Sequence, residues 1–192
     1  MPSPIGHVIA GVAAGWVVAG APSVAPFFAQ QGSKVPGTFW REAALFGALG
    51  AVPDFDLLIG AHSGPIHSIG AAIIVGIVAG IVACVAQRVG VRRLLGLRPL
   101  TLAVACLAAY SSHVLLDWLG RDSSPPIGIM ALWPVSSGYF ECAFHVFMPI
   151  SRRYNQGWTF VAQNAIALVR ELLILVPLLT VTILFRSRSD SR

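Results

Sequence analysis

The chain has 192 residues, of which 56% are hydrophobic and only 11% are charged, and its formal net charge is +5. A soluble domain carries roughly 25% charged residues, so this composition excludes an ordinary soluble domain and predicts one integral membrane domain over residues 1–192. Most arginines lie between apolar segments or at the tail, which indicates membrane topology and not a nucleic-acid surface, and we expect no nucleic-acid partner. The three cysteines show no pairing pattern, so we expect no disulfide framework.

Five apolar segments predict an all-α bundle with four or five membrane segments. They run from about Ile5 to Ala21, Phe39 to Val52, Ile66 to Ala86, Leu100 to Leu119 and Ala165 to Phe185. The first ends like a signal-peptidase site, but no basic residue precedes it, so we interpret it as a membrane helix. The second is short for a bilayer and is expected to be tilted, re-entrant or sheltered by its neighbours. A connector from Pro22 to Gly37 precedes it, and a structured loop or cap from Gly120 to Trp158 follows the fourth segment.

The arginines orient these segments. One group lies between the third and fourth segments and another follows the fifth, and the positive-inside rule predicts that both are cytoplasmic: Arg88, Arg92, Arg93 and Arg98, then Arg186, Arg188 and Arg192. Alternate threading then puts His7, the Asp54–His67 loop and the His113–Asp117 turn together on the outer side. Arg121, Arg152 and Arg153 also fall on that side, but in a long loop, where the rule is weaker.

His113-Val114-Leu115-Leu116-Asp117 is the strongest local motif. A spacing of four puts the imidazole and the carboxylate on one helical face, one turn apart, where both can bind a cation. The alternative is a His–Asp hydrogen bond that fastens a helix end. Both interpretations are open at this point.

Two carboxylates follow the second segment in Pro53-Asp54-Phe55-Asp56. Aspartate is common at helix ends and turns, which would explain them without a function. Two acids beside the apolar run from Phe55 to Ile59 are less ordinary, because an ionisable group at membrane depth marks a functional site by default. We favour the functional interpretation.

Histidines supply the remaining candidates. His62 and His67 flank a Gly-Pro turn at the start of the third segment, beside the two aspartates. His7 lies in the first apolar segment, where a lone histidine is more often a hydrogen-bonded core residue, but its predicted position on the same side adds it to the cluster. His145, Glu141 and Asp122 have no such spacing, and Arg170 and Glu171 are explained by mutual pairing or snorkelling.

Taken in order, these motifs resemble a known family, the YdjM-type membrane-bound metal-dependent hydrolases of bacteria, described as LexA-binding and inner-membrane-associated. The resemblance covers about residues 2 to 137 and rests on His7, Pro53-Asp54-Phe55-Asp56, His62 to His67-Ser68, His113 to Asp117, and Gly128 to Leu132-Trp133-Pro134. Where family members often have Arg-Gly-x-Thr, this chain has Ser63-Gly64-Pro65-Ile66 and so lacks a phosphate-pairing arginine. The resemblance implies a relation to the zinc-dependent phospholipase C and single-strand nuclease fold, which is an analogy of fold alone.

We therefore expect a multi-pass protein of the bacterial inner membrane with a metal-dependent hydrolase site at its outer boundary. The expected substrates are phosphoesters, including lipid-linked ones. The expected ligands of one or more divalent ions, zinc first, are His7, His62, His67, His113, Asp117 and one of Asp54 and Asp56. The other aspartate would be a general base or would orient a ligating histidine.

Two other classes of function remain open from the sequence. The same groups can form a structural metal site or a proton or ion relay in a non-catalytic membrane protein. Relay groups should be distributed through the depth of the bilayer, whereas these cluster at one end, which favours a site. The third class is an interaction protein that binds a soluble regulator, and only the family resemblance implies such a partner. Membrane lipids are the other expected partners.

Overall fold

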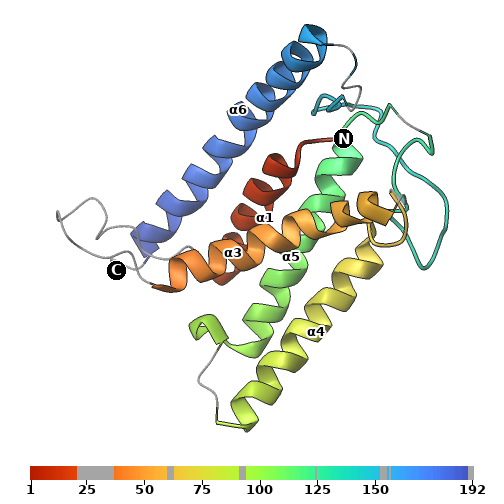
Figure 1. Ribbon diagram of the computed structural model, residues 1–192. Helices are drawn as coiled ribbons and strands as arrows, with labels where there is room; N and C mark the ends of the chain where they lie inside the picture. The colour runs from red at the N-terminus through yellow and green to blue at the C-terminus, as the bar shows by residue number, and fades with distance from the viewer. Residues whose placement is uncertain are drawn as a thin grey trace.

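The computed structural model describes residues 1–20, 37–59, 63–90, 94–123, 125–151, 155 and 157–189. Within these residues the fold is all-α, and the loop segments add two isolated β-bridges, Gly120 with Phe147 and Ile129 with Phe140. The helices are α1 (Pro4–Ala19), α3 (Gly37–Ala51), α4 (Ile69–Arg88), α5 (Pro99–Leu119) and α6 (Trp158–Ser189), with short 3₁₀ helices η1 (Val52–Ile59) and η2 (Leu94–Gly96) (Figure 1).

Each of the five predicted segments corresponds to one helix. The prediction was least accurate for the last, since α6 begins at Trp158 and not near Ala165. Thr159, Gln163 and Asn164 interrupt the apolar pattern there, which hides this start in the sequence. Residues 22–36 of the predicted Pro22–Gly37 connector lie outside the described residues, and so does His62.

Three helices, α4, α5 and α6, are long and apolar enough to cross a membrane. The helices α1 and α3 have 16 and 15 residues, which at 1.5 Å per residue is about 24 and 22 Å, short of a ~30 Å hydrocarbon core. These two pack against each other and against α5, and α6 also covers α1 (Figure 1). The short second segment is therefore sheltered by its neighbours, as one of the sequence alternatives held.

Glycines bring α1 and α3 into close contact. A Cβ added at Gly11 would overlap the carbonyl oxygen of Phe46, and one added at Gly50 would overlap the carbonyl oxygen of His7. Small residues of this kind let helix backbones approach closely in membranes, where packing and not water exclusion drives association. The crossing therefore fixes the distance between the start of α1 and the end of α3.

An apolar core fills the bundle between α1, α3 and α5. Trp16, Phe46, Cys106 and Ala109 are buried there. The indole Nε1–H of Trp16 donates to a carboxylate oxygen of the buried Glu42 at 3.1 Å, so this acid is also satisfied inside the bundle. Among the described residues, this core contains no other charged side chain. Apolar side chains therefore separate Glu42 from the opposite end of the bundle.

The helix ends that carry the predicted site residues lie at one end of the bundle. The start of α1, the end of α3 with η1, the start of α4 and the end of α5 meet at one end of the bundle, whereas the end of α4 at Arg88 and the start of α5 at Pro99 lie at the other (Figure 1). Residues 120–151 are fastened to the first end, where the Arg121 N–H donates to the Phe147 carbonyl and the Ile69 N–H donates to the Ala131 carbonyl. The convergence predicted from alternate threading is thus present, and its assignment to the outer side stays a prediction.

Cysteine labelling tests that assignment. Val89, near the arginine end, and Val135, in the loop at the other end, are 70% and 92% exposed. In a cysteine-free background, an impermeant thiol reagent on intact cells should label Val135→Cys and spare Val89→Cys, because arginine-rich short loops stay cytoplasmic. Permeabilised cells should label both. Labelling of Val89→Cys alone in intact cells would invert the orientation.

Candidate metal centre

Six of the seven predicted site residues meet at this end of the bundle, and the seventh, His62, lies outside the described residues. Three elements and one turn contribute them: α1 carries His7, η1 carries Asp54 and Asp56, the turn before α4 carries His67, and α5 carries His113 and Asp117. Residues from 7 to 117 are therefore brought together by the antiparallel order of the helices.

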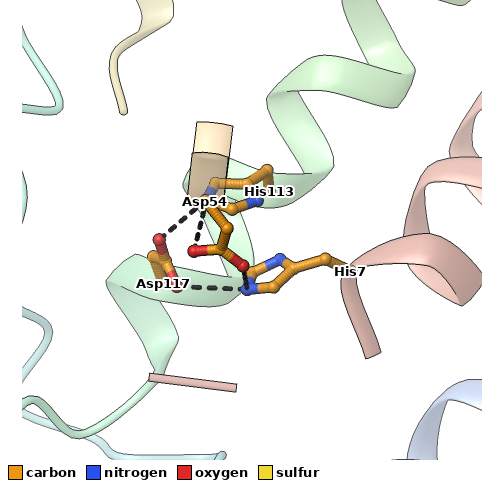
Figure 2. Close-up of side chains that lie close together, drawn as sticks. All are labelled: His7, Asp54, His113 and Asp117. Carbon is orange, nitrogen blue, oxygen red and sulfur yellow. Dashed lines mark ion pairs between the residues drawn. The ribbon is translucent and has the colours of Figure 1, made fainter. Parts of the chain in front are cut away.

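Four side chains form the centre of the cluster. Each of His7, Asp54, His113 and Asp117 offers a ligand atom, and these atoms all lie within 4.8 Å of one another (Figure 2). The His7 Nε2 lies 3.3 Å from Asp117 Oδ1. The His113 Nε2 lies 3.0 Å from Asp117 Oδ2, which confirms that the i, i+4 pair shares one helical face. Asp54 closes the group, because its Oδ2 lies 3.9 Å from His7 Nε2 and its Oδ1 lies 3.9 Å from His113 Nε2.

His67 connects this group to the second aspartate of η1. Its Nδ1 lies 3.0 Å from Asp117 Oδ2 and 3.0 Å from His113 Nε2, and its Nε2 lies 3.1 Å from Asp56 Oδ2. When Asp56 accepts a hydrogen bond from the Nε2–H of His67, the lone pair on Nδ1 of His67 faces the centre. This carboxylate–histidine–metal arrangement is common in metal sites, where the outer carboxylate fixes the tautomer and the ring orientation.

The backbone holds His67 in place. Its N–H donates to the Gly64 carbonyl at 2.9 Å, and the Tyr110 hydroxyl donates to the Ile66 carbonyl at 2.8 Å. Ser68 then caps α4 by accepting from the Ala71 N–H at 3.0 Å. The Gly-Pro turn therefore presents His67 to the centre at the point where α4 begins.

The tautomer of His113 follows from its backbone partner. Its Nδ1 lies 2.7 Å from the Gly50 carbonyl oxygen. A carbonyl oxygen only accepts, so Nδ1 carries the proton and, in the neutral ring, Nε2 carries a lone pair. That lone pair points at the Asp117 carboxylate, which is also an acceptor when ionised. Two acceptors 3.0 Å apart repel unless a proton or a cation lies between them.

Burial makes this conflict costly. The side chains of His7, His113 and Asp117 are fully buried, so water does not screen them. Among the described residues, neither ring nitrogen of His7 forms a hydrogen bond, and no donor bonds to the Asp117 Oδ1. A buried polar group without a partner costs about 1–3 kcal/mol, and more when charged. One cation bound between His7, His113 and Asp117 would satisfy Nε2 of His7 and Oδ1 of Asp117 together, so the donor set fits a metal ion.

Ser3 and Glu171 place His7, and the sequence interpretation missed both. The Ser3 N–H donates to Glu171 Oε1 at 2.8 Å, and its hydroxyl donates to Oε2. The Ser3 oxygen in turn accepts from the Gly6 N–H at 3.1 Å and caps α1. A Ser-Pro pair before an apolar run is a helix-start signal that would have identified the cap. The buried Glu171 in α6 thereby holds the first turn of α1, which carries His7.

Of the two explanations expected for Arg170 and Glu171, mutual pairing or snorkelling, the pairing is therefore wrong. Glu171 is buried and bonds to Ser3 at the start of α1, whereas Arg170 is exposed. The sequence assigned no site role to His145 and Glu141. Their side chains pair with each other outside the cluster, with 3.2 Å between His145 Nε2 and Glu141 Oε1. Asp122 accepts from the Gly128 N–H and so orders the loop.

The fold and the cluster define a multi-pass helical membrane protein with a buried His/Asp group that can hold a metal ion. The family model described as YdjM inner membrane protein matches residues 1–189, so the chain belongs to this family and is a multi-pass protein of the inner membrane. No curated protein and no solved structure matches the chain. The relation to the phospholipase C fold accordingly stays a prediction.

Removal of single ligands tests the centre. We expect His113→Ala and Asp117→Ala to lose most of the bound metal, because each contributes an atom within 4.8 Å of the other three, while circular dichroism still reports a helical protein. His145→Ala is the control and should keep the wild-type metal content. Metal analysis of detergent-purified protein decides it. Equal loss from all three variants, or from none, would contradict the assignment.

Gly50 tests how the helix crossing supports the centre. Gly50→Ala should push α1 away from α3 and displace the carbonyl that fixes His113, which we expect to cost about 1–3 kcal/mol of stability and to lower metal affinity. Gly64→Ala is the control, since nothing lies within 4 Å of the added methyl group. Thermal unfolding in detergent and metal titration measure both effects. A Gly50→Ala protein as stable as Gly64→Ala would show that the close crossing is dispensable.

Proposed function

We propose that this protein is a metal-dependent hydrolase of phosphoesters. The observation that carries the proposal is the set of acceptor atoms of His7, His113 and Asp117, which face one another in full burial and need a positive charge between them. The opening of this set toward Asp54, the one member of the four that is partly exposed, leaves a side from which a substrate reaches the centre.

The donor set favours zinc. Imidazole nitrogens and carboxylate oxygens bind zinc at about 2.0–2.2 Å, so two ligands of a tetrahedral ion lie about 3.3–3.5 Å apart. The 3.3 Å between His7 Nε2 and Asp117 Oδ1 fits this spacing, and the 3.9 Å contacts of Asp54 are somewhat longer. Two histidines with carboxylates and a remaining open position are typical of catalytic zinc sites, whereas structural sites are closed by four protein ligands.

The residues would divide the work as follows. His7, His113 and Asp117 would hold the ion, which when bound would lower the pKa of water toward ~7 and neutralise phosphoryl charge. Asp54 lies at the open side, where its carboxylate would accept a proton from water as a general base. Asp56 acts through His67, whose ring it orients, and is therefore a positioning residue. No nucleophilic serine or cysteine is needed for this reaction.

The competing function, a proton or ion relay, lacks a path through the described residues. The buried charge nearest the other end is Glu42, and the apolar side chains of Trp16, Phe46, Cys106 and Ala109 fill the core between the helices. A relay requires polar groups or water across that depth. A structural metal site would fit the same cluster, and turnover distinguishes it.

An assay of metal-loaded protein tests the proposal. Headgroup-labelled phospholipids, polyprenyl phosphates and a soluble aryl phosphodiester serve as substrates in detergent. We expect hydrolysis that chelation abolishes and Zn²⁺ or Mn²⁺ restores. Asp54→Asn should lower the rate about 10²–10⁴-fold, as loss of a general base does. Asp56→Asn should lower it about 10–100-fold, as loss of an outer carboxylate does.

His145→Ala should keep the wild-type rate, because its imidazole pairs with Glu141 outside the cluster. Bound metal should be measured in every sample. Protein that keeps its metal but cleaves none of the phosphoesters would point to the structural metal site instead.

A further inference from the structure

The entrance to the cluster is apolar. Among its members, the side chains of His7, His67, His113 and Asp117 are fully buried and Asp56 is 4% exposed, while Asp54 is 15% exposed. A ligand therefore reaches the centre past Asp54, which lies in η1. What surrounds Asp54 decides which kind of molecule can approach.

Large apolar side chains flank Asp54 along η1. Val52, Phe55 and Leu57 are 43%, 62% and 38% exposed, and Ile66 and Ile69, where the chain turns into α4, are exposed as well. We call Val52, Phe55 and Leu57 the entrance rim. Exposed apolar area costs roughly 25 cal/mol per Å² in water. The rim lies in η1, which comes between α3 and the membrane-spanning helix α4 in the chain. In an inner-membrane protein, hydrocarbon is the partner that relieves this cost.

The lack of basic residues around η1 also favours an apolar ligand. The sequence from residue 42 to 87, which includes η1 and the turn with His67, contains no lysine or arginine. A soluble, anionic phosphoester is normally collected by basic side chains around its site. Along this stretch only the centre itself attracts the phosphate, so the additional binding energy that the rim supplies comes from apolar contacts with another part of the substrate.

We propose that the centre acts on a membrane-resident phosphoester with a hydrocarbon tail, and that this lipid enters from the bilayer across the entrance rim. The phosphate lies at Asp54 and the centre, while the first carbons of the tail pack on Phe55 and Leu57. The inference rests on the proposed hydrolase function and adds its substrate class. It also explains how a largely buried cluster is reached through its one partly exposed member, Asp54, because the tail never leaves the membrane.

Rim variants test this with two substrates that share one headgroup, a long-chain phosphoester in vesicles and its short-chain, water-soluble analogue. Phe55→Ser combined with Leu57→Ser should lower kcat/KM for the long-chain substrate by about tenfold or more, given the value of burying one large apolar side chain. The rate with the short-chain analogue and the metal content should stay within twofold. Phe55→Leu should retain the wild-type preference, since it keeps an apolar contact.

Phe144→Ser is the matched control, because Phe144 is also highly exposed but lies in the loop of residues 120–151. It should change neither rate. A second readout does not need turnover: a phospholipid with a photoactivatable group near its headgroup, in nanodiscs with the metal-loaded protein, should label residues of η1 in preference to α6.

The outcomes separate the two proposals. Equal loss of both substrates in the rim variant, or no loss with the long-chain substrate, would overturn the lipid entrance and leave the hydrolase proposal standing. Labelling confined to α6 would overturn the entrance too. Failure of the wild-type, metal-loaded protein to cleave either substrate would overturn the hydrolase function and, with it, the substrate class.

Discussion

A buried carboxylate inside a membrane bundle needs a positive charge or hydrogen-bond donors beside it, and this constraint governs the structure. Asp117 is fully buried and has imidazole nitrogens of His7, His67 and His113 around it. Glu171 takes its donors from Ser3, and Glu42 takes one from Trp16. The contacts Asp117–His7 and Glu42–Trp16 each join two helices, and Glu171–Ser3 joins α6 to the N-terminal cap of α1. The cost of leaving an acid unpaired in a low dielectric therefore also fixes how the helices are arranged.

The close crossing of α1 and α3 follows from the same requirement. Glycines at the contact let the two backbones meet, and the meeting brings His7 of α1 to the end of α3, whose Gly50 carbonyl sets the tautomer of His113. A larger residue at Gly50 would overlap the backbone of His7. Helix packing and ligand chemistry are therefore coupled at one residue, which explains why two helices too short to span the bilayer have a defined position.

The site and the surface around it combine a buried polar cluster with an apolar approach. The polar cluster is enclosed by α1, α3 and α5, and its one partly exposed member, Asp54, lies among apolar side chains. Charged groups are thus kept away from lipid while the path to them is hydrophobic. Such an arrangement suits a substrate whose reacting group is anionic and whose remainder is hydrocarbon, because each part meets the environment that it prefers.

The sequence by itself determined the helices and the identity of the cluster. Long apolar runs have few alternatives in lipid, where the backbone must satisfy its own hydrogen bonds, and this is why five helices were predictable. The ionisable residues were conspicuous against an apolar background, so His7, Asp54, Asp56, His67, His113 and Asp117 were all identified. The spacing of His113 and Asp117 even gave their shared face, because helix geometry is local.

Only the tertiary structure decided which groups meet which. Pairing with its sequence neighbour Arg170, or snorkelling, was expected for Glu171, yet its partner is Ser3, 168 residues away. Asp54 lies at the centre, whereas Asp56 lies behind His67. These two aspartates are only two residues apart in the chain, and no sequence pattern distinguishes them. The tautomer of His113 depends on a carbonyl, which every residue has. Long-range packing sets these contacts, and the physical reason is that a local pattern encodes the face of a helix but not the helix that will cover it.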